Sequence, residues 1–269
     1  MPRREWRLIQ AWKAKRQGQV WVVENQYGRR GYFKFARADQ WFFSGPMIAN
    51  EYISAALAQK LGFPTADLEQ AKVEGPDGVE QQGIVSLALP ALEVITWREA
   101  NAAVHKHPEK HVHNLERLAQ LVVFDAWIAN IDRATGKNLV LHRDKPDEKY
   151  NWYLIDHGHC LYGSPRKWKR GQWDTKIWEQ LWRYYNVPKG LLRLQSHYDI
   201  LLPMIRKIEA LNESDIEMAM QTVPKSHLKE KERRFIKRLL LHRQKQLRKI
   251  IQRWLDYKGI KEYGEVSRG

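Results

Sequence analysis

The 269-residue sequence predicts an α+β protein of two lobes, a small antiparallel β-rich lobe followed by a larger helical lobe. Short alternating apolar segments dominate the first 90 residues, whereas longer segments with helical periodicity dominate the remainder. Pro90 closes a strand-like segment where the two patterns meet. We therefore expect a domain boundary near residue 90, with one lobe at 1–90 and the other at 91–269.

The composition indicates a packed globular protein, since 43% of the residues are hydrophobic and twelve are tryptophan. Cys160 is the single cysteine, which excludes a disulfide framework and a cysteine-based zinc site. The sequence contains no run of about eighteen apolar residues, and residues 1–5 lack the apolar core of a signal peptide. These features predict a cytoplasmic protein without a transmembrane segment.

The first lobe begins with three predicted strands. They cover Trp6–Trp12, Gln19–Glu24 and Gly31–Phe35, and a basic loop ending at Gly18 connects the first two. Lys34 lies in the middle of the third strand between two phenylalanines. A lone lysine in a strand most often points outward into solvent. A functional role for Lys34 therefore requires a partner of opposite charge.

A helix is predicted after the third strand, because Pro46 marks its start and Gly62 with Pro64 marks its end. Glu51 falls in its second turn, where an inward glutamate needs a cationic partner. Lys34 is the nearest candidate. A hairpin with a turn at 75–78 follows, and its second strand, 83–89, ends at Pro90.

The central stretch of the second lobe carries the residues best suited to chemistry. A helix is predicted over Leu115–Ala129, with Asn114 as its N-cap and with Asp125 on its apolar stripe, where it would brace the next loop. That polar loop runs from residue 130 to residue 138. Short strands at 139–141 and 153–155 follow, and the second strand leads directly into Asp156.

The polar loop and the second strand present two carboxylates and a carboxamide, from Asp132, Asp156 and Asn138. Magnesium-dependent phosphoryl transfer uses such a set. One carboxylate orients the acceptor, while the amide and the other carboxylate hold the metal on the nucleotide phosphates.

Two other segments are less specific. His105, His107, His111 and His113 lie around Pro108, and a solvated loop is favoured over a metal site because no clean i, i+4 pair exists. The basic, tryptophan-rich segment 166–173 could line an acceptor groove, and a surface loop is an equal alternative.

The C-terminal part is predicted to be helical at 177–185, 191–209, 214–223 (capped by Ser214) and about 227–257. Between Lys225 and Arg253 there are twelve lysines and arginines against Glu230 and Glu232. The excess is consistent with a solvated helix face or with an anionic partner such as RNA or a tRNA-bound protein.

Four motifs, in this order over residues 6–165, make the chain resemble the HipA-like kinases and, more distantly, the type II phosphatidylinositol kinases. They are Tyr32-Phe33-Lys34-Phe35, a helix from Asn50-Glu51-Tyr52 to Lys60-Leu61-Gly62-Phe63-Pro64, Asn130-Ile131-Asp132-Arg133 with Asn138-Leu139, and Leu154-Ile155-Asp156-His157-Gly158.

The resemblance implies a two-lobed, protein-kinase-like fold, in which the first lobe binds the nucleotide and the second is catalytic. It implies that Lys34 contacts the ATP phosphates and pairs with Glu51, and that Asp132 is the catalytic carboxylate, supported by Arg133. Asn138 and Asp156 are implied as ligands of Mg²⁺. Further contacts to the nucleotide are expected from Gly18 and Asn130, and from strand 83–89, whose Val85 and Leu87 would line the adenine pocket while backbone groups bind the edge of the base.

The function expected from these features is ATP- and Mg²⁺-dependent transfer of the γ-phosphoryl group to a hydroxyl, with a protein serine or threonine as the expected acceptor. A lipid or small-polyol kinase on the same fold is an alternative. A nucleotide- or nucleic-acid-binding module without turnover is a third, and the complete set of site residues argues against it.

Overall fold

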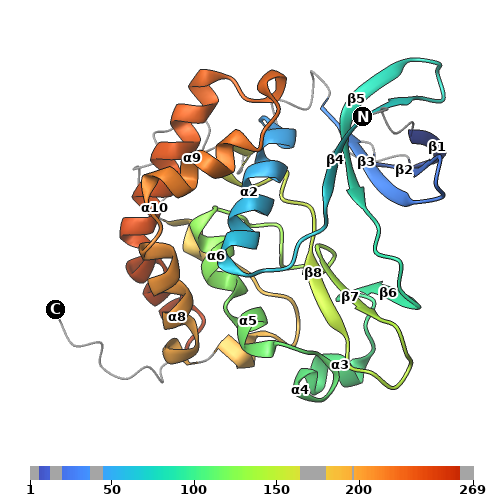
Figure 1. The fold of residues 1–269 in the computed structure, drawn as a ribbon. Helices are drawn as coiled ribbons and strands as arrows, with labels where there is room; N and C mark the ends of the chain where they lie inside the picture. The colour runs from blue at the N-terminus through green and yellow to red at the C-terminus, as the bar shows by residue number, and fades with distance from the viewer. Residues whose placement is uncertain (1–5, 13–19, 37–44, 164–179, 196, 261–269) are drawn as a thin grey trace.

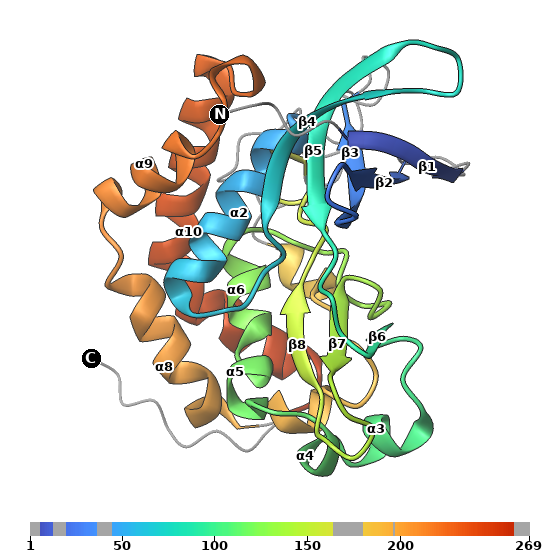
Figure 2. The same cartoon turned by 45° about the vertical axis from the view of Figure 1, so that its right-hand side comes forward.

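The computed structural model describes residues 6–12, 20–36, 45–163, 180–195 and 197–260, and Figure 1 shows their arrangement. The loop that contains Gly18 and the segment 166–173 lie outside these residues. A five-stranded antiparallel sheet occupies one end of the molecule, a three-stranded sheet lies beside it, and helices form the other side (Figures 1 and 2).

The five-stranded sheet has the strand order β1-β2-β3-β5-β4. Its strands are β1 (Trp6–Trp12), β2 (Val20–Asn25), β3 (Arg30–Phe35), β4 (Leu68–Glu74) and β5 (Glu80–Leu87). One face buries a separate hydrophobic cluster in which the ring centroids of Trp21 and Phe35 are 4.7 Å apart. The predicted strands and the hairpin turn are therefore present, although β5 ends two residues before Leu89.

Helix α2 (Met47–Leu61) ends at Gly62, which adopts φ +84° and closes the helix with a left-handed cap. Its buried apolar side chains, including Ile53 and Leu57, belong to the large core of the helical part rather than to the cluster of the five-stranded sheet. Figure 1 shows α2 between the sheet and the C-terminal helices. This placement anchors the helix that carries Glu51 to the second half of the chain.

The second sheet, of order β6-β7-β8, contains β6 (Glu93–Thr96), β7 (Leu139–Arg143) and β8 (Asn151–Leu154). The sequence did not predict β6, which is four residues long and has no clear alternation. The histidine-rich segment is not a loop, because it forms the short helices α3 (Ala102–Lys106) and α4 (Pro108–His111). The His105 ring packs on Trp97 and its Nε2 lies 2.7 Å from the Trp97 carbonyl oxygen.

The single helix predicted at 115–129 is two helices, α5 (Leu115–Ala119) and α6 (Leu121–Trp127). They meet at Gln120, whose buried amide donates to the carbonyl oxygen of Ile200 at 3.0 Å. Asn114 does not cap α5 through its side chain, and its backbone is left-handed with φ +53°. Ala129 also has positive φ, so the chain turns away from the helix before the polar loop.

The C-terminal part contains three long helices, α8 (Tyr198–Glu209), α9 (Glu213–Gln221) and α10 (Glu230–Tyr257). Short 3₁₀ turns precede and connect them: η1 (Leu161–Gly163), η3 (Gln180–Tyr184), η4 (Leu192–Gln195) and η5 (Lys225–His227). The helix predicted from residue 191 thus begins only at Tyr198, and the one predicted at 177–185 is 3₁₀ where described. Asn212, rather than Ser214, caps α9, in a capping box with Asp215.

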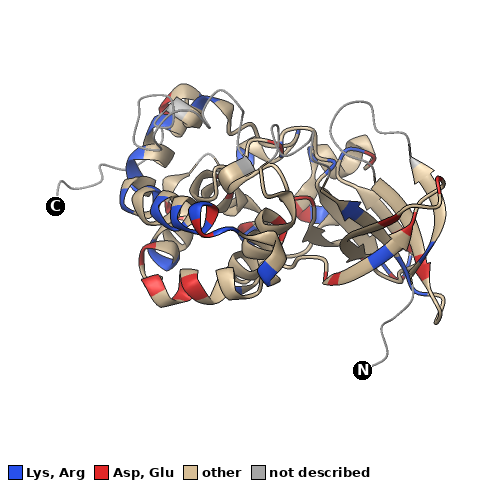
Figure 3. Ribbon diagram, turned by 90° about the horizontal axis from the view of Figure 1, so that it is seen from above, with Lys and Arg blue, Asp and Glu red and all other residues tan. Residues whose placement is uncertain are grey.

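Helix α10 holds much of the positive charge, and Figure 3 shows Lys and Arg gathered on the helical side of the molecule. Several of these cations have structural roles: Arg233 and Lys237 pair with α9, and Arg248 pairs with Glu209 of α8. Arg243 is buried and donates to the carbonyl oxygens of Ala126 and Trp127 at the end of α6. No helix among the described residues is long and apolar enough to cross a membrane.

Candidate active site

Lys34 of β3 lies between two carboxylates that come from distant parts of the chain. Its Nζ donates to Glu51 Oε1 of α2 at 2.7 Å and to Asp156 Oδ1 after β8 at 2.9 Å. Lys34 and Glu51 are buried, whereas the Asp156 side chain keeps 37% of its surface exposed. The pair expected between Lys34 and Glu51 is present, and Asp156 is the partly open member of the group.

The electrostatics keep Lys34 and Asp156 charged. Burial lowers the pKa of Lys34, but attraction by Asp156 and Glu51 outweighs it and the pKa rises above its usual value. Burial also raises the pKa of Asp156, and the Lys34 ammonium reverses this effect and holds that pKa at about 2. Asp156 has φ +60°, a left-handed conformation that aims its carboxylate at Lys34.

Asp132 and Asn138 meet on the polar loop before β7. Asn138 Nδ2 donates to the backbone oxygen of Asp132 at 3.0 Å and to its Oδ2 at 3.3 Å. In the part of the chain that the structure describes, no donor bonds to Asn138 Oδ1, so this oxygen is available to a cation. Burial, followed by repulsion from Asp156, raises the pKa of Asp132. The two carboxylates therefore lie close enough to affect one another.

Beneath the loop, Asp125 and Arg133 form a buried bidentate ion pair, with Nε–Oδ2 and Nη2–Oδ1 distances of 3.1 and 3.2 Å. Arg133 Nη1 also donates to the backbone oxygen of Asn138. Asn130 donates to Asp125 Oδ1 at 2.8 Å and accepts from the Asp132 amide at 3.1 Å. These hydrogen bonds hold the polar loop in place through the backbone groups of Asp132 and Asn138.

His157 joins this buried network to Glu51. Its backbone N–H donates to Glu51 Oε2 at 2.8 Å, and its Nε2 lies 3.3 Å from Arg133 Nη2. Because arginine can only donate, Nε2 accepts, which places the ring proton on Nδ1, 3.9 Å from Glu51 Oε2. Burial, followed by the charge of Arg133, lowers the pKa of His157 well below its usual value, so the ring is neutral at neutral pH.

Close packing explains the glycine that follows His157. A Cβ added to Gly158 would lie 2.6 Å from Met47 Cγ at the start of α2, and the Gly158 carbonyl accepts from Asn50 Nδ2 at 3.0 Å. Only a glycine therefore lets α2 pass this close to the segment after Asp156.

The nucleotide contacts predicted for strand 83–89 involve backbone groups, so they stay a prediction whatever face the side chains occupy. Val85 and Leu87 pair with Phe33 and Gly31, and their side chains belong to the core cluster on the face of the sheet opposite Lys34. Ile84 and Ser86 are the β5 side chains that share the face of Lys34. Gly18 lies outside the described residues, and Asn130 is committed to the network beneath the loop.

His157 and Asn50 are site residues to which the sequence reasoning gave no role. Each stands beside a residue that received one, namely Asp156 and Glu51. A buried polar side chain needs a hydrogen-bond partner. Their positions next to Asp156 and Glu51 were the sequence feature that could have identified His157 and Asn50 as site residues.

The donor set fits a magnesium ion held jointly by the protein and a nucleotide. Within the described ranges there is no group of three or more His, Cys, Asp or Glu that could hold a metal alone. Asn138 and Asp156 supply one amide and one carboxylate oxygen, and Mg²⁺ at phosphate sites commonly binds to one or two protein ligands plus phosphate oxygens and water.

Comparison with known proteins agrees with this geometry. The structure is similar to the Helicobacter pylori proinflammatory kinase CtkA, with a TM-score of 0.61 and 12% identity over 94% of this chain and 96% of that one. It is also similar to the golgi casein kinase, with a TM-score of 0.51 and 13% identity over 96% of this chain and 73% of the other. These likenesses confirm a two-lobed, protein-kinase-like α+β fold.

The sequence comparisons add the family. No curated protein matches the chain at a significant level. The family model described as HipA-like kinase matches residues 44–185, which include α2, the polar loop and the segment around Asp156. The chain therefore belongs to the HipA-like kinase family and is a phosphotransferase.

Proposed function

We propose that this kinase transfers the γ-phosphoryl group of ATP to the hydroxyl of a protein serine or threonine in a Mg²⁺-dependent reaction. The observation that carries the proposal is Lys34 held between Glu51 and Asp156, with Asp132 and Asn138 on the adjoining loop. Such a set provides the positioning and the charge neutralisation that phosphoryl transfer requires.

Each residue has a proposed role. Lys34, oriented by Glu51, binds the phosphates. Asn138 through Oδ1 and Asp156 through Oδ2, the oxygen to which Lys34 does not donate, would hold Mg²⁺, which would neutralise charge developing on the transferred group. Asp132 receives the acceptor's hydroxyl proton, and its raised pKa makes it a better proton acceptor than an ordinary aspartate.

Arg133 and Asn130 act in this proposal as supports. Both are buried, and their polar atoms are used by Asp125, by the Asp132 amide and by the Asn138 carbonyl. We therefore assign Asn130 to the loop rather than to the nucleotide. Residues 1–90 are proposed as the nucleotide-binding lobe and 91–269 as the catalytic lobe, with α2 anchored in the core of the latter.

Membership of the HipA-like kinase family supports a protein acceptor, and the lipid and polyol alternatives have no observation of their own in their favour. A cytoplasmic location stays a prediction. So does an anionic partner such as RNA, for which α10 offers one exposed face formed by Lys231, Arg238, Lys245 and Lys249. Strong weakening of RNA binding with added salt, lost when these four residues become glutamine, would support that partner.

The test is transfer of label from γ-³²P-ATP to proteins of a cell extract, followed by phosphoamino-acid analysis of the labelled bands. We expect labelled serine or threonine with the parent chain, and none with Asp132→Asn or without Mg²⁺. Label found in a lipid or polyol fraction would overturn the protein acceptor, and no transfer to any acceptor would overturn the proposed reaction.

A further inference from the structure

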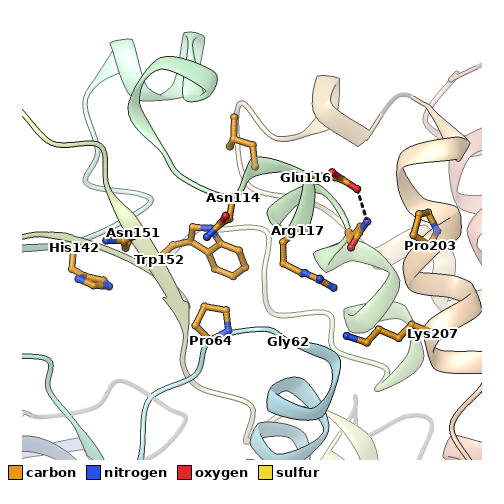
Figure 4. Close-up of a pocket in the computed structure, with 12 residues that line it drawn as sticks. Gly62, Pro64, Asn114, Glu116, Arg117, His142, Asn151, Trp152, Pro203 and Lys207 are labelled. Atoms are coloured by element: carbon orange, nitrogen blue, oxygen red, sulfur yellow. Dashed lines mark hydrogen bonds between the residues drawn. The ribbon is translucent and has the colours of Figure 1, made fainter.

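A cavity lies away from Lys34, where the end of α2 meets α5, α8 and the β7–β8 strands (Figure 4). Its volume is about 830 Å³. Glu51 and Leu61 are ten positions apart on α2, which places this cavity roughly 15 Å along the helix from Glu51. The cavity is therefore distinct from the proposed nucleotide site.

Two cations project into this cavity beside Gly62. Lys207 Nζ of α8 donates to the Leu61 carbonyl oxygen at 2.8 Å, and Arg117 Nη1 of α5 donates to the same oxygen at 3.1 Å. Figure 4 shows their charged ends turned toward one another. Burial, followed by the charge of Arg117, lowers the pKa of Lys207. Two like charges are thus held together on one helix end.

Capping of α2 accounts for only part of this arrangement. A helix C-terminus attracts cations, but one bond from each side chain to Leu61 leaves most of the eight N–H groups of a lysine and an arginine unused. Over the described ranges neither cation forms an ion pair. Glu116, the acid in the cavity wall, instead accepts from Gln120 Nε2 at 3.5 Å.

Neutral donors complete the wall. The carboxamides of Asn114 and Asn151 line the cavity, and neither makes a side-chain hydrogen bond to any residue that the structure describes. A guanidinium, an ammonium and amide groups around one space form a donor set that suits a tetrahedral oxyanion.

We propose that this cavity is a second anion site, which binds the phosphate group of a small phosphorylated molecule. Arg117 and Lys207 bind the phosphate oxygens, and Asn114 and Asn151 add neutral hydrogen bonds. The rest of the ligand lies against the buried Trp152 indole, whose Nε1 is held by the His113 carbonyl oxygen at 3.0 Å.

The test is calorimetric titration with inorganic pyrophosphate, without magnesium, in a Lys34→Met background that removes the cation of the proposed nucleotide site. Adding Lys207→Gln should weaken binding about ten-fold or more, since it removes a charged hydrogen-bond donor. Arg206→Gln is the matched control, because Arg206 is the exposed neighbour on α8 that does not line the cavity. The control should bind within about two-fold of the background, as expected for an exposed charge outside the cavity that salt screens.

Two outcomes overturn the site: no pyrophosphate binding in the Lys34→Met background, or equal weakening by Lys207→Gln and Arg206→Gln. Because Lys207→Gln also removes a bond to α2, a second readout uses the otherwise unaltered chain. The ¹⁵N-indole signal of Trp152, assigned with Trp152→Phe, should shift on titration with pyrophosphate, and an unmoved signal contradicts the proposal. Neither experiment depends on phosphoryl transfer, so failure here leaves the proposed kinase reaction untouched.

Discussion

At the scale of single residues, the site depends on charges that lie close together and are partly withdrawn from water. Asp156 has its pKa at about 2 against an ordinary 3.8, so its pairing stabilises the fold above about pH 4 and is lost as the pH falls toward 2. Asp132 behaves in the opposite way, because burial and Asp156 raise its pKa and make its charged form unfavourable in the folded protein. The two carboxylates are thus suited to different tasks.

Asp132→Asn should lower turnover at least about 10³-fold, because it removes the group that accepts the proton. The same change should raise the melting temperature of the nucleotide-free protein by roughly 2 °C, since the repulsion from Asp156 disappears. Kinetics and calorimetry at pH 7 check the two effects. A variant with parental turnover would contradict the role, and a lower melting temperature would contradict the electrostatic reason.

His157→Phe should reduce turnover about 10-fold or more with little change in the KM for ATP, because Arg133 loses one of its acceptors and Glu51 loses the facing Nδ1–H. ADP formation at varied ATP concentration measures both constants. His157→Gln, which keeps a polar side chain, should recover part of the loss. Equal constants for the parent and both variants would show that His157 does not position Glu51 or the loop.

At the scale of elements, the strands with clear alternation and the helix bounded by Pro46 and Gly62 could be predicted from the sequence. Strand β6 could not, because four residues without a pattern carry too little signal. The face of the sheet on which the side chains of Val85 and Leu87 lie could not be predicted either, because it depends on the register of β5 against β3. The break at Gln120 depends on a hydrogen bond to Ile200, eighty residues away.

In the candidate site, too, some features could be predicted from local sequence and others depend on tertiary contacts. Lys34, Glu51, Asp132, Asn138 and Asp156 stand in motifs that could be read locally, and the structure places them side by side. The hydrogen bonds from Asn130 to Asp125 and from Arg133 to His157 are tertiary contacts, and local sequence does not encode them.

Arg243 connects α10 to the end of α6, directly before the polar loop. Arg243→Met should lower the free energy of unfolding by about 2–4 kcal/mol, because buried carbonyl oxygens lose charged donors. Urea unfolding followed by circular dichroism measures the change. Lys245→Met is the control on the exposed face, with an expected change within about 0.5 kcal/mol. Equal stability of the two variants would refute the structural role of Arg243.

At the scale of the whole molecule, α2 joins the two sheets, because its apolar side lies in the large core while Glu51 reaches Lys34 on β3. Asp156 and His157 meet the same helix from the second half of the chain. A ligand that contacts both Lys34 and Asp156 would therefore connect both halves and should stabilise the protein as one unit.

The most direct measurement is the melting temperature with ATP, with and without Mg²⁺, for the parent chain and for Asp156→Asn. Ligand at about 100 times its Kd contributes about 2.7 kcal/mol, which corresponds to several degrees for a protein of this size. The account predicts such a rise for the parent only when both ATP and Mg²⁺ are present, and little or none for the variant. An unchanged melting temperature for the parent at saturating Mg²⁺ and ATP, or an equal rise for Asp156→Asn, would contradict the proposed nucleotide site.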